Sequence, residues 1–180
     1  QIATGGSMLN FGYWSKEHSD PISAQENLCN VFGNLSELST AKNALDVGSG
    51  LSAPSKLWRD SYPTLNLYDV NINFQQLSFL KHEKNIEFLN STSTKLPFAN
   101  NSVDRVLALE SAQHFKPLDN FISESKRVLM KSGFLVMAVP ITLKNSSLGR
   151  LGLLKFTWSS EHYGLDYLRD LISSNGFKII

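Results

Sequence analysis

Apolar positions recur at two different spacings along the chain, and the change of spacing marks the expected elements. Between residues 20 and 42 the apolar side chains fall at helical intervals, and Pro21 stands where such a helix would start. From residue 43 onward, short apolar runs alternate with amphipathic stretches. The short runs predict strands at residues 44–47, 65–70, 86–90, 103–111, 134–140 and 177–180. The stretches between them predict helices at residues 52–60, 73–82, 118–133 and 165–177.

Residues at the helix ends refine these boundaries. Ser52 is expected to cap the helix that starts after the first strand, with Pro54 in its first turn. Gly133 and Gly176 are expected to end the last two helices, because glycine readily adopts the left-handed conformation that terminates a helix.

Strands that alternate with helices predict an α/β fold with a doubly wound, mostly parallel, Rossmann-like sheet and helices on both faces. Residues 8–42 are expected to form an N-terminal helical arm, and residues 43–180 the sheet domain. Residues 1–7, before Met8, are expected to be a cloning remnant. In such sheets, ligands bind beyond the carboxyl ends of the strands, so the residues that follow each strand are the candidates for a site.

Composition narrows the class of protein. Lys and Arg total 17 against 16 Asp and Glu, so no excess charge favours nucleic acid or an acidic membrane as a partner. The single cysteine, Cys29, excludes an internal disulfide framework and a cysteine metal cluster, and we expect no metal. The longest apolar run is too short to span a bilayer. We expect a cytoplasmic protein, monomeric or homodimeric, with a small-molecule partner.

The sequence NALDVGSGLSAPSKLW holds a glycine turn between the first strand and the next helix. Gly48, Gly50 and Ala53 fit the pattern G-x-G-x-x-[GA], which suits a dinucleotide and also any tight turn between strand and helix. Asp46, two positions before Gly48, would repel a pyrophosphate but attract an ammonium group. Asp69, at the end of the second strand, suits the hydroxyls of a ribose. S-adenosylmethionine carries an amino-acid end and a ribose but no phosphate, so it fits better than NAD.

Several motifs resemble those of class I S-adenosylmethionine-dependent methyltransferases of the small-molecule branch, which includes sugar O-, sarcosine and dimethylglycine N-, and prenyl or sterol C-methyltransferases. They are LDVGSG, LYDVN, LPFANNSVDRVLALESAQHF and RVLMKSGFLVMAVP, and NFGYW resembles the arm that closes over the cofactor. The resemblance implies transfer of a methyl group to O, N or C of a small molecule, with S-adenosylhomocysteine as product. Expected cofactor-binding residues are Asp46, Gly48, Ser49, Gly50, Asp69, Val70, Asn71, Thr92, Ser93 and Leu109. Ser91, Thr92 and Ser93 stand where the family often has Gly-Asp-Ala, so the contact to adenine is expected to be weaker.

Residues after the fourth strand are the candidates for chemistry. His114 is expected to act as general base or as an orienting donor, with a purely structural role as the alternative. Glu110 and Gln113 are expected to face the acceptor, with Glu110 orienting a cation or pairing with His114, or else lying as a solvated residue at the strand end.

Aromatic residues in two other segments are candidates for acceptor contacts. Tyr13 and Trp14 are expected over the sulfonium or the acceptor, or else as packing of the arm. Trp158 and Tyr163 are expected in the acceptor wall. A non-catalytic cofactor-binding module remains an alternative function, as does, with less support, a dinucleotide-dependent oxidoreductase.

Overall fold

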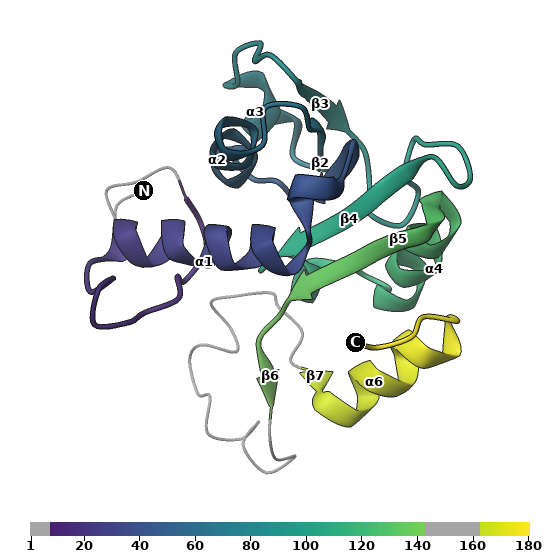
Figure 1. Cartoon of the computed structure of the whole chain (residues 1–180). Coiled ribbons are helices and arrows are strands. Elements are labelled where there is room, and N and C mark those ends of the chain that lie inside the picture. Colours follow the sequence, from purple (N-terminus) through teal and green to yellow (C-terminus); the bar gives the residue numbers. More distant parts are fainter. Residues whose placement is uncertain (1–7, 143–162) are drawn as a thin grey trace.

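A five-stranded parallel sheet with the order β3-β2-β1-β4-β5 forms the centre of the molecule (Figure 1). The computed structural model describes residues 8–142 and 163–180. The strands of this sheet are β1 (Asn43–Val47), β2 (Asn66–Asn71), β3 (Ile86–Asn90), β4 (Val103–Leu109) and β5 (Leu129–Ala138). The main helices are α1 (Pro21–Leu35), α2 (Ala53–Ser61), α3 (Phe74–Ser78), α4 (Leu118–Val128) and α6 (Leu165–Ser174). Short 3-10 helices, η1 (Leu38–Thr40) and η2 (Ala112–His114), follow α1 and β4.

Side chains of the central strands alternate between two apolar cores, one on each face of the sheet. Leu45, Val47, Val106 and Ala108 belong to the core that also contains residues of α4 and α6, among them Phe121, Ile122 and Leu168. Ala44, Leu107 and Leu109 belong to the second core, with Cys29, Phe32 and Trp58 of α1 and α2. Because β1 and β4 are covered on both sides, most of their residues are apolar, although Asp46 and Arg105 are buried within them. The expected doubly wound parallel sheet is confirmed.

Several boundaries differ from the expected ones. The helix expected at residues 118–133 ends at Val128, because the carbonyl groups of Arg127 and Val128 accept hydrogen bonds from Asn101 and Ser102 and the chain then pairs with β4. Gly133 instead lies inside β5, where a side chain would meet Leu129 at 2.8 Å. The helix expected at residues 20–42 ends at Leu35, and the one expected at 73–82 ends at Ser78.

Two further expectations are wrong in detail. Ser52 does precede α2, but its side chain makes no capping hydrogen bond within the described structure, and its φ is +61°. The strand expected at residues 177–180 is absent from the described part of the chain. There the Phe177 amide donates to Ile172 and the Lys126 ammonium lies over the Phe177 ring. A short parallel pair that was not expected joins β6 (Ile141–Thr142) to β7 (Tyr163–Gly164).

Among the helices that the structure describes, none combines the length and the apolar character that crossing a membrane requires.

Candidate active site

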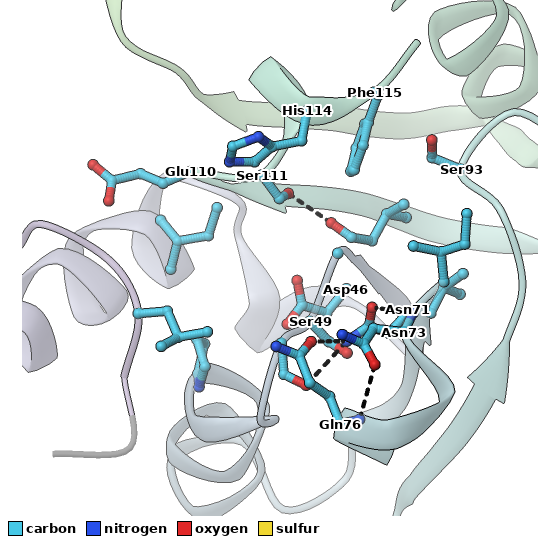
Figure 2. Close-up of a pocket in the computed structure, with 18 of the residues that line it drawn as sticks. Asp46, Ser49, Asn71, Asn73, Gln76, Ser93, Glu110, Ser111, His114 and Phe115 are labelled. Carbon is cyan, nitrogen blue, oxygen red and sulfur yellow. Dashed lines mark hydrogen bonds between the residues drawn. The ribbon is translucent and has the colours of Figure 1, made fainter. Parts of the chain in front are cut away.

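A cavity of about 750 Å³ lies at the carboxyl ends of β1, β2 and β4, where the order of the strands reverses. Its size is that of a pocket for a small molecule or a cofactor. Residues 46–51, 70–73, 91–93 and 109–111 line it, together with residues 113–116 and residues 9–11 of the N-terminal segment. Figure 2 shows Asp46, Ser49 and a cluster of amides on one side, with Glu110, Ser111, His114 and Phe115 on the other.

The glycine turn at the end of β1 is shaped by close packing against the segment after β4. Gly48 and Gly50 have φ values of +78° and +56°, which favour glycine. A Cβ atom on Gly48 would lie 2.6 Å from the Cβ atom of Ser111. The Ser111 hydroxyl donates to the Val47 carbonyl at 2.7 Å, which holds the two strand ends together. The packing of the fold therefore requires glycine at position 48.

Two carboxylates lie side by side beneath the turn. Asp46 and Asp69 are neighbours across the β1–β2 register, and both are buried. The Ser55 hydroxyl lies 2.5 Å from Asp69 Oδ1 and 3.3 Å from Asp46 Oδ2. Loss of solvation, and then the charge of Asp69, raise the pKa of Asp46 well above its ordinary value. Loss of solvation also raises the pKa of Asp69 to about 6, although Ser52, Ser55 and Lys56 oppose it.

Only the first of these carboxylates reaches the cavity. Asp46 lines it, whereas Asp69 is absent from the cavity wall formed by the described residues and its side chain is fully buried. The expectation that Asp69 faces the crevice is not met: its carboxylate is buried and accepts the Ser55 hydroxyl, and β2 continues for two residues beyond it, to Asn71.

Amide side chains at and just after the end of β2 line the cavity where Asp69 was expected. The Asn71 amide nitrogen donates to Gln76 Oε1 at 2.8 Å and to the Gly50 carbonyl at 3.1 Å. Asn73 caps α3 by accepting from the Gln76 backbone at 3.2 Å. Asn71, Asn73 and Gln76 all line the cavity, as does the expected Val70. Sequence reasoning missed Asn73 and Gln76, although their position just after a strand was a usable signal.

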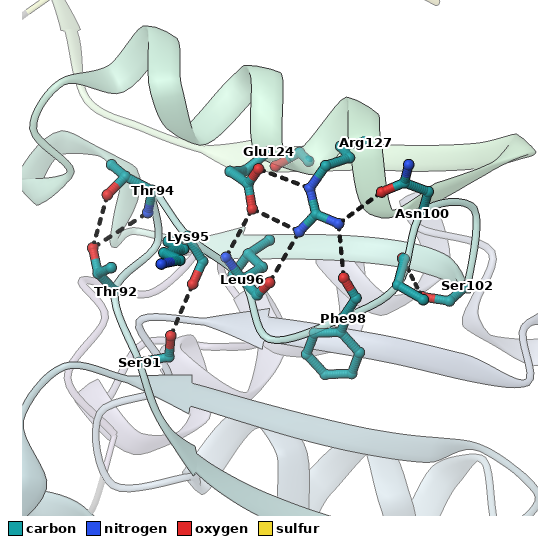
Figure 3. A network of polar contacts seen from close by, with 12 residues as sticks. Ser91, Thr92, Thr94, Lys95, Leu96, Phe98, Asn100, Ser102, Glu124 and Arg127 are labelled. Atoms are coloured by element: carbon teal, nitrogen blue, oxygen red, sulfur yellow. Dashed lines mark hydrogen bonds and ion pairs between the residues drawn. The ribbon is translucent and has the colours of Figure 1, made fainter.

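The loop that follows β3 supplies Ser91, Thr92 and Ser93 to the cavity. The Thr92 and Thr94 hydroxyl oxygens lie 3.0 Å apart, and the Ser91 hydroxyl donates to the Lys95 carbonyl. Figure 3 shows how α4 fixes the rest of this loop through Arg127 and Glu124. The Arg127 guanidinium donates to the carbonyl groups of Leu96 and Phe98 at 3.0 and 2.7 Å and to both carboxylate oxygens of Glu124.

The segment after β4 brings together the residues expected to carry chemistry. Leu109, Glu110, Gln113 and His114 all line the cavity, and the His114 side chain is exposed there. Glu110 does not pair with His114 as one alternative expected. Instead, its carboxylate accepts the Phe11 backbone amide at 2.6 Å. The Gln113 amide nitrogen donates to the Glu110 carbonyl at 2.6 Å, which fixes the turn.

The N-terminal segment covers the cavity with residues other than those expected. Leu9, Asn10 and Phe11 line it, whereas Tyr13 and Trp14 are 56% and 54% exposed and are absent from the described wall. Gly12 packs against Ala24, and the Tyr13 amide donates to the Ala24 carbonyl. These contacts direct the chain toward α1 at Gly12 and Tyr13, and so away from the cavity.

Of the last two expected acceptor residues, the structure describes only Tyr163, which does not line the cavity. Tyr163 lies in β7 and stacks on Tyr167, with ring centroids 5.6 Å apart. Trp158 lies outside the described residues. Within residues 8–142 and 163–180, no group of three or more His, Cys, Asp or Glu side chains is placed to hold a metal ion.

Comparison with known proteins places this geometry in a family. The sequence signature described as "Methyltransferase domain" matches residues 45–137, more than half of the chain. Erythromycin 3''-O-methyltransferase of Saccharopolyspora erythraea is 26% identical over 153 residues, which cover 80% of this chain and 50% of the relative. Methyltransferase GfsG of Streptomyces halstedii is 28% identical over 139 residues, 72% of this chain and 50% of the relative. The chain thus spans about half the length of these relatives.

Solved structures share the fold at lower identity. The [4+2]-cyclase SpnF superimposes with a TM-score of 0.84 at 20% identity, over 99% of this chain and 68% of its own. The cyclopropane synthase MmaA2 of Mycobacterium tuberculosis gives 0.79 at 16% identity, over 96% of this chain and 67% of its own. The match of the family signature, on a parallel sheet with its cavity at the reversal of strand order, shows that the chain belongs to the methyltransferase-domain family.

Proposed function

We propose that this chain transfers a methyl group from S-adenosylmethionine to a small molecule and releases S-adenosylhomocysteine. The observation that carries the proposal is the donor set around the cavity: a carboxylate at the end of β1, a glycine turn beside it, and amides after β2. This set suits a ligand with an ammonium group and a ribose, and Asp46 disfavours one with a pyrophosphate. When bound, S-adenosylmethionine supplies an electrophilic methyl group on a sulfonium.

Each end of the ligand has candidate partners in the chain. Asp46 would hold the ammonium group, and the backbone at Gly48, Ser49 and Gly50 allows close approach. Asn71, Asn73 and Gln76, rather than the buried Asp69, would contact the ribose. Adenine would lie between Val70, Leu109 and the hydroxyl groups of Thr92 and Ser93.

The segment after β4 would receive the methyl acceptor. His114 is exposed within the cavity, so it would take a proton from a hydroxyl acceptor or orient that hydroxyl. Two relatives are named as O-methyltransferases, of erythromycin and of a fatty acid, which favours oxygen over nitrogen or carbon as the acceptor atom. The second of these relatives matches only 52% of this chain.

Calorimetry and product analysis test the proposal. S-adenosylmethionine and S-adenosylhomocysteine are expected to bind with similar stoichiometry, and NAD is expected not to bind. Hydroxyl-bearing small molecules are then screened for release of S-adenosylhomocysteine. Binding of NAD alone would overturn the cofactor assignment, and binding of S-adenosylmethionine without turnover over a broad panel would favour a non-catalytic module.

Replacement of His114 tests the proposed base. With a hydroxyl acceptor, His114→Ala is expected to lower turnover by about 10²–10⁴-fold and to leave the affinity for S-adenosylhomocysteine nearly unchanged. The exposed His82, on the segment before β3, provides a matched control variant, His82→Ala, with unchanged turnover. A His114→Ala enzyme that melts at lower temperature, with full turnover per folded molecule, would assign His114 a structural role.

A further inference from the structure

We infer that Glu110 is a positioning residue that holds the inner part of the arm segment (residues 8–14), Leu9 to Phe11, over the cavity and so sets how long the cofactor stays bound. The inference rests on the proposed function for its ligand. It assigns the Glu110 carboxylate to the protein's own backbone rather than to a substrate cation.

The contact itself joins two distant parts of the chain. Glu110 Oε2 accepts the Phe11 amide at 2.6 Å, across 99 positions of sequence. Burial raises the pKa of Glu110, and the hydrogen bond from Phe11 opposes that rise, so this bond favours the charged carboxylate. A hydrogen bond to a charged acceptor is about twice as strong as one between neutral groups. The bond is therefore a strong one for a contact at the edge of a cavity.

The backbone at Glu110 is held in an uncommon conformation that aims the side chain at the arm. Glu110 has a φ of +50°, which non-glycine residues adopt at a cost in free energy. Its backbone is fixed on both sides, because its amide donates to the Ala138 carbonyl and its carbonyl accepts from Gln113. The strain is maintained by the surrounding structure, as is typical of residues with a role at a site.

The arm segment has two sets of anchors with different consequences. Its outer part is tied to α1, since the Tyr13 amide donates to Ala24 and the Asn27 side chain donates to the Tyr13 carbonyl at 2.8 Å. Its inner part, Leu9 to Phe11, forms one wall of the cavity. Asn10 within it is also tied to α1, because its carbonyl accepts the Gln25 side-chain amide and its own side-chain amide donates to Cys29 Sγ at 3.5 Å. Glu110 ties the Phe11 end of this inner part to the sheet. Loss of the Glu110 contact would loosen the cavity wall at Phe11 while the attachments to α1 remain.

Amide hydrogen exchange on the ligand-free protein tests the contact directly. In Glu110→Ala the Phe11 amide is expected to exchange about tenfold to a hundredfold faster than in the wild type, as expected for loss of a charged hydrogen-bond partner. Glu110→Gln keeps an acceptor oxygen and is expected to retain most of the protection. Asn27→Ala removes an outer anchor and serves as the matched control, with the Phe11 amide still protected.

Release of S-adenosylhomocysteine, followed by stopped-flow competition, tests the consequence. Glu110→Ala is expected to raise the dissociation rate by about tenfold or more, with Glu110→Gln and Asn27→Ala close to the wild type. Glu110→Leu removes the same oxygens at similar volume and replaces the alanine variant if that variant folds poorly. If the Phe11 amide exchanges at the wild-type rate in both Glu110→Ala and Glu110→Leu, the positioning role of Glu110 is overturned. Failure of the wild type to bind S-adenosylhomocysteine would instead overturn the proposed function.

Discussion

Single residues around the cavity are in conformations and environments that cost stability. Asp46 and Asp69 are both buried, and they share the hydroxyl of Ser55. Glu110 and Ser52 have positive φ values without being glycine. Such features persist where the surrounding structure maintains them, and they gather at functional sites. Substitutions that relieve these costs are therefore expected to stabilise the fold while they impair binding.

The carboxylate pair should make the ligand-free protein less stable as pH rises. The pKa of Asp69 is about 6 in the folded state and about 3.8 unfolded, so the folded state holds the proton between these values. Its stabilising contribution is complete below about pH 4 and is lost as pH rises through 6. Asp46→Asn removes one of the two charges. Its free energy of unfolding is thus expected to exceed that of the wild type by about 1–3 kcal/mol at pH 7.5 and by much less at pH 4.

Urea unfolding at the two pH values measures this gain. Asp170→Asn, which changes an exposed carboxylate on α6, is the control and is expected to differ little from the wild type at either pH. An equal gain for Asp46→Asn at both pH values would contradict the electrostatic explanation.

Gly48 is expected to tolerate no side chain. Gly48→Ala combines a φ of +78° with a Cβ atom 2.6 Å from that of Ser111, so we expect a loss of more than about 2 kcal/mol of unfolding free energy. Gly164→Ala is the matched control, because a Cβ atom there meets no described atom within 4 Å. Thermal unfolding of the two variants should differ clearly, and equal melting temperatures would refute the packing argument.

At the scale of elements, α4 acts on the cavity through the loop that follows β3. Arg127 and Glu124 bind the loop backbone at Leu96 and Phe98, and Phe98 packs edge-on against Tyr68 of β2 (Figure 3). These contacts fix the part of the loop that follows Thr92 and Ser93, and so act on the two cavity residues through the backbone. The guanidinium is suited to the task because its planar fork reaches two carbonyl groups and a carboxylate at once.

Arg127→Ala is expected to loosen this loop and to weaken binding of S-adenosylhomocysteine by about tenfold, with a loss of about 1–3 kcal/mol of stability. Arg127→Lys is expected to recover little, since an ammonium group cannot reproduce the forked contacts. Calorimetry with S-adenosylhomocysteine and with homocysteine alone separates the effects. If both ligands weaken equally, the loop does not act on the adenosine end.

The elements themselves were largely predictable from sequence, because strands buried on both faces are continuous apolar runs. The strand expected at residues 86–90 has those bounds in the structure, and the other strands of the sheet are shifted by one to five residues. Helix ends depended on partners far away in sequence. Helix α4 ends at Val128 because the backbone amides of residues 101–102 donate to the last carbonyl groups of the helix. No local signal reveals that competition.

Candidate site residues could be predicted where their position at the end of a strand was enough to place them in the cavity. Asp46, Asn71 and Leu109 lie at the carboxyl ends of strands, His114 follows one, and all four line the cavity. Tyr13 and Trp14 were chosen for their chemistry, but the turn at Gly12 directs the chain to α1 and leaves Leu9 and Phe11 over the cavity instead. Asp69 was assigned to the strand end when the strand continues to Asn71.

At the scale of the whole molecule, the cavity is open between elements that are each packed on their own core. The chain is therefore expected to fold without a ligand. A ligand that binds only the folded state then raises the free energy of unfolding by mass action. S-adenosylhomocysteine at a hundred times its dissociation constant is expected to add about 2.7 kcal/mol.

For a chain of this length that corresponds to a rise of about 5–10 °C in melting temperature, measured by calorimetry or by dye binding. NAD at the same concentration is expected to give no shift. An equal shift with both compounds would point to a general nucleoside site and away from the assigned cofactor.

The reversal of strand order at β1 has an evolutionary consequence. Most residues proposed for the cofactor lie at or after the carboxyl ends of β1, β2 and β3, on one side of the reversal, with Leu109 at the end of β4 added from the other side. His114 and its neighbours follow β4. Because separate crossovers carry most of the two sets, drift in the segment after β4 can alter the proposed acceptor while the proposed methyl donor stays the same. That separation lets one inherited scaffold diversify over many acceptors, and relatives of this chain at 26–28% identity are the expected products of such divergence.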